Sequence, residues 1–110
     1  MSKTKPNITH SQDGEKYLEK RLRQAVEKMG GKALKFSSAT ETGYPDRIVL
    51  LPTGQTFFVE LKTKGEKPRT LQEVRIEELR RMSFPVFVVD SAEILTVTIN
   101  LFRHELSKRV

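Results

Sequence analysis

The spacing of hydrophobic positions predicts two helices in this chain. In the stretch GEKYLEKRLRQAVEKMGG, apolar residues recur every three or four positions, and Gly30-Gly31 is a typical helix stop. A second helix is expected over Leu71–Met82, because Thr70 and Glu73 have the spacing of a capping box in front of it. The apolar positions of the first helix are Leu18, Leu22, Ala25, Val26 and Met29.

Strand patterns fill the segments around the second helix. A short strand is expected over residues 33–37, and a hairpin over Asp46–Leu51 and Thr56–Lys62 with its turn at Pro52-Thr53-Gly54. The run FPVFVVD is apolar throughout, which is typical of a strand buried on both faces.

The C-terminal segment, residues 91–107, fits two interpretations. The run ILTVTI is rich in β-forming residues, but Ser91 is a good helix cap and the apolar positions have helical spacing, so a helix is favoured. The order α-β-β-β-α-β-α then predicts an α/β fold in which helices flank a small mixed sheet.

Length and composition predict one basic domain. The chain has 110 residues, of which residues 13–110 are expected to form a single domain behind a flexible polar arm, residues 1–12. Lys and Arg number 20 against 14 acids, a net charge of +6 that suits a polyanionic partner such as nucleic acid. The absence of cysteine excludes disulfides, thiolate metal sites and cysteine nucleophiles.

No segment has the pattern of a membrane-spanning helix or a secretory signal peptide. No apolar run approaches the roughly 20 residues that span a bilayer, and the N-terminus lacks the apolar stretch of a signal peptide. An intracellular protein that is not secreted and has no membrane partner is expected.

Charged residues occupy unexpected positions in the predicted hairpin. Glu60 and Lys62 share one strand face with Phe58, and Asp46 begins the partner strand, so the two carboxylates can lie side by side. Adjacent carboxylates repel unless a cation lies between them, and oxygen ligands without His or Cys suit Mg²⁺ or Mn²⁺. The alternative is structural: Glu60 and Lys62 form an ion pair at a solvated strand end, and Asp46 caps a turn.

Three residues on the predicted helices are candidates to join this hairpin end. Glu15 projects with the apolar stripe of its helix, which suggests a paired or metal-bound carboxylate, although a first-turn acid also complements the helix dipole. Gln72 shares a helix face with Ile76 and Leu79 and could reach back to the hairpin, unless it is an ordinary first-turn residue. Arg75 lies on a nearby face as an electrostatic candidate.

These motifs resemble a known nuclease family. YPD at 44–46 followed by ELK at 60–62 resembles the PD-(D/E)xK nuclease signature. The wider frame of MGG, KF, GYPDRIVLLPTGQTFFVELK, KPRTLQ and VFVVDS, over about residues 14–93, resembles the VRR-NUC family, particularly its small stand-alone, phage-type members. One departure is Ser83, where the family often has glycine.

The resemblance implies a restriction-endonuclease-like core and an endonuclease that depends on Mg²⁺ or Mn²⁺. The implied catalytic residues are Asp46, Glu60, Lys62 and Gln72. The implied metal ligands are Glu15, Asp46, Glu60 and the backbone carbonyl of Leu61. The resemblance also implies a homodimer that cuts branched DNA such as four-way (Holliday) junctions, in the cytoplasm of a bacterial or phage-infected cell.

Basic residues around the predicted site are candidates for DNA contacts, and they are Lys16, Lys20, Lys64, Lys67, Arg69 and Arg75. Arg23 and Lys28 lie on the same exposed side of the first helix as Lys16 and Lys20, and for Lys28, farthest from the site, a role in solubility is favoured. Three other functions stay open: a non-catalytic nucleic-acid-binding module, a structural or adaptor protein, and a nuclease that acts on ordinary duplex DNA.

Overall fold

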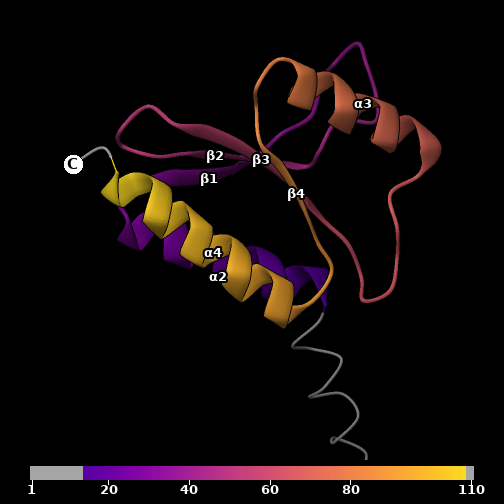
Figure 1. Ribbon diagram of the computed structural model, residues 1–110. Helices are drawn as coiled ribbons and strands as arrows, with labels where there is room; N and C mark the ends of the chain where they lie inside the picture. The colour runs from indigo at the N-terminus through magenta and orange to yellow at the C-terminus, as the bar shows by residue number, and fades with distance from the viewer. Residues whose placement is uncertain (1–13, 109–110) are drawn as a thin grey trace, which may run out of the picture.

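A four-stranded sheet between helices forms the body of the protein (Figure 1). The computed structural model describes residues 14–108, so the predicted arm, residues 1–12, lies outside the described residues. In chain order the elements are α2 (Glu15–Lys28), β1 (Lys32–Lys35), β2 (Arg47–Leu50), β3 (Thr56–Leu61), α3 (Thr70–Arg81), β4 (Val86–Val89) and α4 (Ala92–Ser107). The predicted α/β fold and its order of elements are confirmed, including the C-terminal helix.

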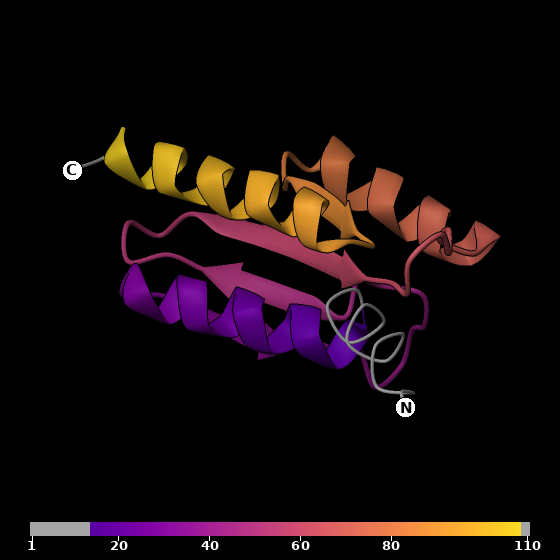
Figure 2. The ribbon, with the colours of Figure 1, turned by 90° about the horizontal axis from the view of Figure 1, so that it is seen from below.

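The sheet is mixed, with strand order β1-β2-β3-β4. The first three strands are antiparallel, whereas β4 runs parallel to β3 because α3 carries the chain back between them. Helices α2 and α4 lie side by side over one face of the sheet, and α3 covers the other (Figures 1 and 2). The register pairs Arg47 with Val59, so the next pair along the hairpin is Asp46 and Glu60.

The strand β3 is buried on both faces, and its side chains divide between two cores. Phe57, Val59 and Leu61 pack under α2 and α4, with the Phe57 ring centroid 4.8 Å from that of Phe102. Phe58 instead packs under α3 with Ile76. This division confirms the alternation predicted for the strand, and it makes Glu60 a carboxylate inside a covered sheet.

The strand β4 also contributes to both cores, as its apolar run predicted. Val89 joins the core under α2 and α4, and Val86 joins the core under α3. Beyond β4, the Ser91 hydroxyl accepts a hydrogen bond from the Ile94 N–H at 3.2 Å. Ser91 is therefore the N-cap of α4, as expected.

The predicted capping box of α3 is wrong by one residue. The N-cap is Arg69, and its N–H donates to Oε1 of Gln72 at 2.9 Å. Thr70 is already the first helical residue, so the side chain that reaches back is Gln72 and not Glu73. The sequence alone could not decide between Thr70 with Glu73 and Arg69 with Gln72 as the capping pair, because both Gln and Glu can accept from the N-cap backbone.

The end of α3 carries an uncommon backbone conformation. Ser83 has φ +72°, in the left-handed region that favours glycine. Its N–H donates to the carbonyl of Arg80 at 2.9 Å, and the Phe84 N–H donates to that of Leu79 at 3.0 Å. This arrangement reverses the chain into β4, so a serine stands where a glycine would fit with less strain.

We expect Ser83→Gly to stabilise the protein by about 0.5–1 kcal/mol, because a left-handed residue with a Cβ costs about 1–2 kcal/mol, partly offset by the greater entropy of glycine in the unfolded chain. Urea denaturation measures the change. Ser83→Ala is the matched control, since it also removes the hydroxyl but keeps the Cβ. A gain of equal size in the alanine variant would contradict the backbone explanation.

Candidate active site

The carboxylates of Asp46 and Glu60 lie at the open end of the β2–β3 hairpin, where backbone hydrogen bonds hold both in place. The N–H of Asp46 donates to Oε1 of Glu60 at 3.2 Å, and the N–H of Leu61 donates to Oδ1 of Asp46 at 3.2 Å. Each carboxylate therefore satisfies a backbone donor beyond the last ladder pair. The expected side-by-side arrangement of the two acids is confirmed.

The backbone of Leu61 faces the same side as Asp46. In a strand, the N–H and the carbonyl of one residue point the same way, so the Leu61 carbonyl is directed toward the Asp46 side of β3. The next residue faces the other way, and the Lys62 N–H donates to the Val89 carbonyl of β4 at 2.9 Å. A backbone oxygen is thus available beside the two carboxylates.

Glu60, Lys62 and Gln72 form a closed triangle of hydrogen bonds. Oε2 of Glu60 accepts from Nε2 of Gln72 at 3.0 Å and lies 3.3 Å from Nζ of Lys62. Nζ of Lys62 in turn donates to Oε1 of Gln72 at 2.9 Å. A carboxylate only accepts and an ammonium only donates, so the amide of Gln72 can be oriented in one way alone. The predicted reach of Gln72 to the hairpin end is confirmed.

Burial raises the pKa of both carboxyl groups. For Asp46 burial is the main cause, opposed by the Leu61 N–H and by the charge of Arg47. For Glu60, which is 4% exposed, burial comes first and the negative charge of Asp46 adds to it, while Lys62 lowers the pKa. With both groups ionised, Lys62 beside Glu60 and Arg47 beside Asp46 offset part of the repulsion between the carboxylates. Arg47 is also shared with Glu19, so a bound cation would relieve the repulsion that remains.

Glu15 is exposed, although its helical angle places it on the apolar stripe of α2. It is the first residue of the helix, so the buried stripe begins one turn later at Leu18. The helix does begin at the end of the sheet where β2 starts and β3 ends (Figure 2). Glu19, one turn further along, reaches Arg47 with 4.0 Å between its Oε2 and the arginine Nε.

The donors at this end of the sheet fit a hard divalent cation. Within residues 14–108, no three His, Asp or Glu side chains are grouped closely enough to hold a metal by themselves. Asp46, Glu60 and the Leu61 carbonyl nevertheless supply the oxygen donors that Mg²⁺ or Mn²⁺ prefers, and such ions keep several waters when few protein ligands are present. Glu15 as a further ligand stays a prediction.

Arg47 is a neighbour of the site that the sequence did not single out. Its side chain is 12% exposed, its NH1 donates to the Asp46 carbonyl at 2.9 Å, and NH1 lies 3.7 Å from Oδ2 of Asp46. In the part of the chain that is described, its buried Nε has no hydrogen-bond partner. The sequence did hold one indication of this role: Arg47 is a charged residue on the same face of β2 as the buried Val49.

Arg75 ties the loop before Asp46 to α3. Its Nε donates to the Thr42 carbonyl at 3.0 Å, its NH1 pairs with Glu41 at 3.3 Å, and its guanidinium lies 4.9 Å from the centre of the Tyr44 ring. The Tyr44 hydroxyl donates to Glu78 at 2.6 Å, which is the main reason why the pKa of Tyr44 is raised. Arg75 thus positions the loop, and its DNA contact stays a prediction.

The other predicted DNA-binding residues are exposed around the site. Lys64, Lys67 and Arg69 lie in the loop from β3 to α3, directly after the strand that carries Glu60. Lys16 and Lys20 lie on the first two turns of α2.

Comparisons with known proteins agree with this architecture. The sequence matches no family model. Over 80 residues it is 41% identical to "Putative nuclease p44" of Acyrthosiphon pisum secondary endosymbiont phage 1, a match that covers 73% of this chain and 86% of that protein. A solved structure described as "VRR_NUC domain" has a TM-score of 0.74 and 33% identity, with 78% of this chain and 94% of that chain covered.

The mixed sheet flanked by helices and the two matches place the protein in the class of α/β nucleases. The chain belongs to the VRR-NUC family, as its motifs predicted. Within residues 14–108, no helix is long and apolar enough to cross a membrane.

We expect Asp46→Asn to stabilise the metal-free protein at neutral pH. The asparagine oxygen still accepts from Leu61, but the repulsion with Glu60 is gone, a gain of up to about 1 kcal/mol that solvent screening reduces. A carboxyl whose pKa is raised by folding stabilises the folded state at low pH and loses that contribution as the pH rises through the raised pKa. The gain should therefore be present at pH 7 and absent below about pH 4.

Urea denaturation in EDTA at both pH values measures this difference. Glu77→Gln, which neutralises an exposed carboxylate on α3, is the control for a general effect of charge. A destabilised Asp46→Asn variant at pH 7 would show that the two carboxylates do not oppose each other.

Proposed function

We propose that the protein is an endonuclease that hydrolyses phosphodiester bonds of DNA with the help of Mg²⁺ or Mn²⁺. One observation carries the proposal: Asp46 and Glu60 face each other across the hairpin end, and Lys62 lies 3.3 Å from Glu60 on the same strand face. Two mutually repelling carboxylates and one fixed ammonium suit a reaction in which a phosphate anion meets a water molecule.

The carboxylates and the lysine have separate tasks in this proposal. Asp46, Glu60 and the Leu61 carbonyl would hold the metal, with Glu15 approaching from the start of α2. A bound metal offsets the charge of the phosphodiester and lowers the pKa of its water. Lys62 cannot be a ligand because an ammonium has no lone pair, but it can orient the attacking water and donate to the charge that develops on the phosphate.

Gln72 is the residue that positions Lys62 and Glu60 relative to each other. Its amide oxygen accepts from the lysine and its amide nitrogen donates to the glutamate, so both side chains are held before substrate arrives. Its amide oxygen also accepts from the Arg69 N–H, which connects the triangle to the start of α3. The basic loop that precedes α3 would then lie beside the bound phosphate.

We expect Glu60→Gln to abolish metal-dependent cleavage and Lys62→Met to slow it by about 10²–10³-fold while Mn²⁺ still binds. Single-turnover cleavage gives the rate, and calorimetric titration with Mn²⁺ gives the affinity. Lys32→Met, which removes an exposed lysine from β1, is the control.

An unchanged rate in Lys62→Met would remove that residue from the mechanism. Wild-type protein that binds DNA but cleaves nothing with either metal would favour the alternative of a non-catalytic binding module.

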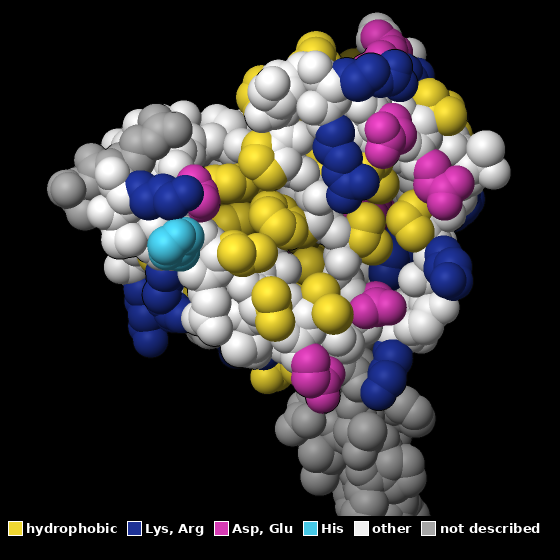
Figure 3. Space-filling model, viewed as in Figure 1, with side chains coloured by type: hydrophobic (Ala, Val, Ile, Leu, Met, Phe, Trp, Pro, Cys, Tyr) yellow, Lys and Arg dark blue, Asp and Glu magenta, His cyan; other side chains and the backbone are white. Residues whose placement is uncertain are grey.

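We propose further that the protein acts as a homodimer on branched DNA such as four-way junctions. Among residues 14–108, Asp46 and Glu60 are the pair of acids that face each other at the proposed site. Paired cuts across a junction would therefore need two copies, and closed two-fold pairs are the commonest assembly. Exposed apolar residues of α4 offer a surface for pairing: Ile94, Val97 and Leu101 recur at helical spacing. Figure 3 shows hydrophobic side chains gathered over α4 and beside β4. The phage origin of the similar nuclease supports action inside an infected bacterial cell.

We expect light scattering to give a dimer for the wild-type chain and a monomer for the double variant Val97→Glu/Leu101→Glu. Both side chains are exposed, so the variant should stay folded, which circular dichroism checks. The dimer should make paired cuts in a four-way junction faster than in a linear duplex of matched sequence, and the monomer should only nick.

A monomeric wild-type protein that still makes paired cuts would exclude the dimer. A variant that remains dimeric would place the interface elsewhere, and equal rates on both DNAs would favour the alternative of a nuclease for ordinary duplex.

A further inference from the structure

The side chains of α2 are sorted into ridges at i, i+4 spacing. The buried ridge consists of Leu18, Leu22 and Val26. The acids of the helix share one ridge, which reads Glu15, Glu19, Arg23 and Glu27. Arg23 lies 3.6 Å from Glu19 and 4.0 Å from Glu27, so one cation is shared by two of the three acids and this ridge stays acidic.

A third ridge of α2 is basic and contains no acid. It reads Lys16, Lys20, Gln24 and Lys28. These four positions lie roughly opposite the buried ridge, and all four residues are exposed. The row extends for about 18 Å along the helix, at 1.5 Å per residue, from the end of the sheet that holds the candidate active site.

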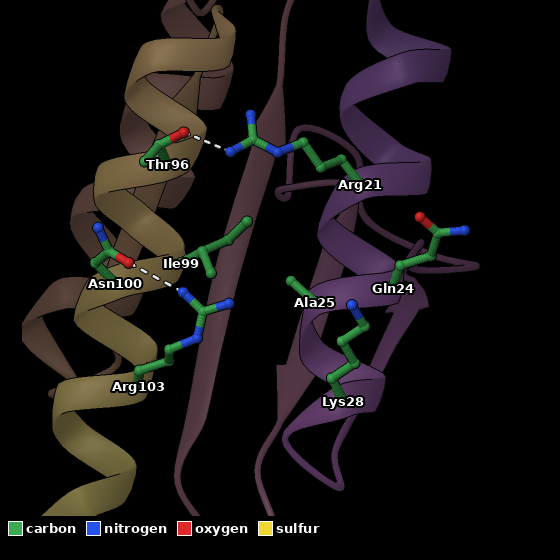
Figure 4. Close-up of a pocket in the computed structure, with 8 residues that line it drawn as sticks. All are labelled: Arg21, Gln24, Ala25, Lys28, Thr96, Ile99, Asn100 and Arg103. Carbon is green, nitrogen blue, oxygen red and sulfur yellow. Dashed lines mark hydrogen bonds between the residues drawn. The ribbon is translucent and has the colours of Figure 1, made fainter.

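The basic ridge leads into a groove between α2 and α4. The groove is a hollow of about 210 Å³ whose lining has three cations and no carboxylate. The lining residues are Arg21, Gln24, Ala25, Lys28, Thr96, Ile99, Asn100 and Arg103 (Figure 4). Every polar side chain among them can donate a hydrogen bond, so the groove is built for an anion with several acceptor oxygens.

Hydrogen bonds within the groove hold its walls while leaving donors open. Arg21 crosses from α2 to α4, where it donates to the Ala92 carbonyl at 3.2 Å and to the Thr96 hydroxyl. NH1 of Arg103 donates to Oδ1 of Asn100 at 3.0 Å, which leaves the second amino group of its guanidinium as a further donor. Lys28 and Arg103 lie on facing walls at the end of the groove away from Arg21 (Figure 4).

We infer that the α2/α4 groove binds the phosphodiester backbone of the DNA substrate at a distance from the cut. The cations form a row that continues from the site into the groove. Such a row suits a polymer with regularly spaced phosphates, whereas a single phosphate ion would need only one cluster of cations. Two apolar residues, Ala25 and Ile99, are too little for stacking bases, so the contact is with the backbone. The inference rests on the proposed function for the identity of the nucleic acid.

The helix geometry gives the reach of this second contact. Arg21 and Lys28 are about 9 and 20 Å along the helix axis from Glu15, the first residue of α2. Duplex DNA rises 3.4 Å per base pair, so the groove would meet phosphates about three to six base pairs from the cut. Lys28, for which the sequence favoured a role in solubility, becomes a DNA-contacting residue together with Arg103.

The double variant Lys28→Gln/Arg103→Gln tests the inference, because both side chains are exposed and neither belongs to the site. Binding to a duplex of about 25 base pairs is measured by fluorescence anisotropy in EDTA over a range of salt concentrations. Each lost phosphate contact lowers the slope of log K against log salt by about 0.9, so we expect a loss of about 1.8. With Mg²⁺ and saturating DNA, the cleavage rate should equal that of wild type.

The control is Arg80→Gln/Arg81→Gln, which removes the same charge from α3, on the face of the sheet opposite the groove. Equal losses in the two double variants, or a wild-type slope in Lys28→Gln/Arg103→Gln, would overturn the inference. Binding and cleavage are separate readouts. A wild-type protein that never cleaves, with a slope that still falls only in the groove variant, would refute the nuclease proposal and support the groove.

Discussion

The antiparallel register of β2 and β3 is the constraint on which the site depends. It brings Asp46 opposite Glu60, and each carboxylate then accepts from the backbone of the other strand. A shift of one residue would turn Glu60 toward α2 and α4 and Leu61 toward α3, since strand side chains alternate. The hydrophobic division of β3 between two cores forbids that shift, so core packing fixes the position of the acids.

The same burial that fixes Glu60 makes its charge unfavourable. The carboxylate is covered by α3 and faces a second carboxylate, and Lys62 and Gln72 offset only part of that cost. The site thus stores electrostatic repulsion that a bound cation would relieve. Because stability comes from two apolar cores, the fold tolerates one unfavourable pair at the hairpin end.

The features that the sequence predicted correctly depend on residues close together in the chain. The alternation of β3 and the short turn at Gly54 fixed which residues face each other, so the Asp46–Glu60 pair and the core face followed from neighbours in the chain. Glu15 shows the limit of periodicity, since its helical angle matches the apolar stripe, but Glu15 is exposed as the first residue of α2 and the buried stripe begins at Leu18. The functional class was predicted from the VRR-NUC motifs, because hydrophobic periodicity indicates secondary structure and not function.

Long-range contacts account for what the sequence missed. The ion pair of Arg47 with Glu19 joins a strand to a helix, and neither partner has a local signal for the other. The groove is lined by α2 and α4, whose facing residues Arg21 and Thr96 are 75 positions apart. The capping of α3 by Gln72 also depends on context, because the amide is already held by Glu60 and Lys62.

The sorting of the α2 side chains into ridges restricts how this helix can evolve. Substitutions within one ridge leave the others in place, but insertion or deletion of a single residue turns every later side chain by about 100°. A change of length near Arg21 would move Gln24 and Lys28 off the solvent side and carry charged side chains toward the core. We expect related chains to vary in the composition of this helix far more freely than in its length.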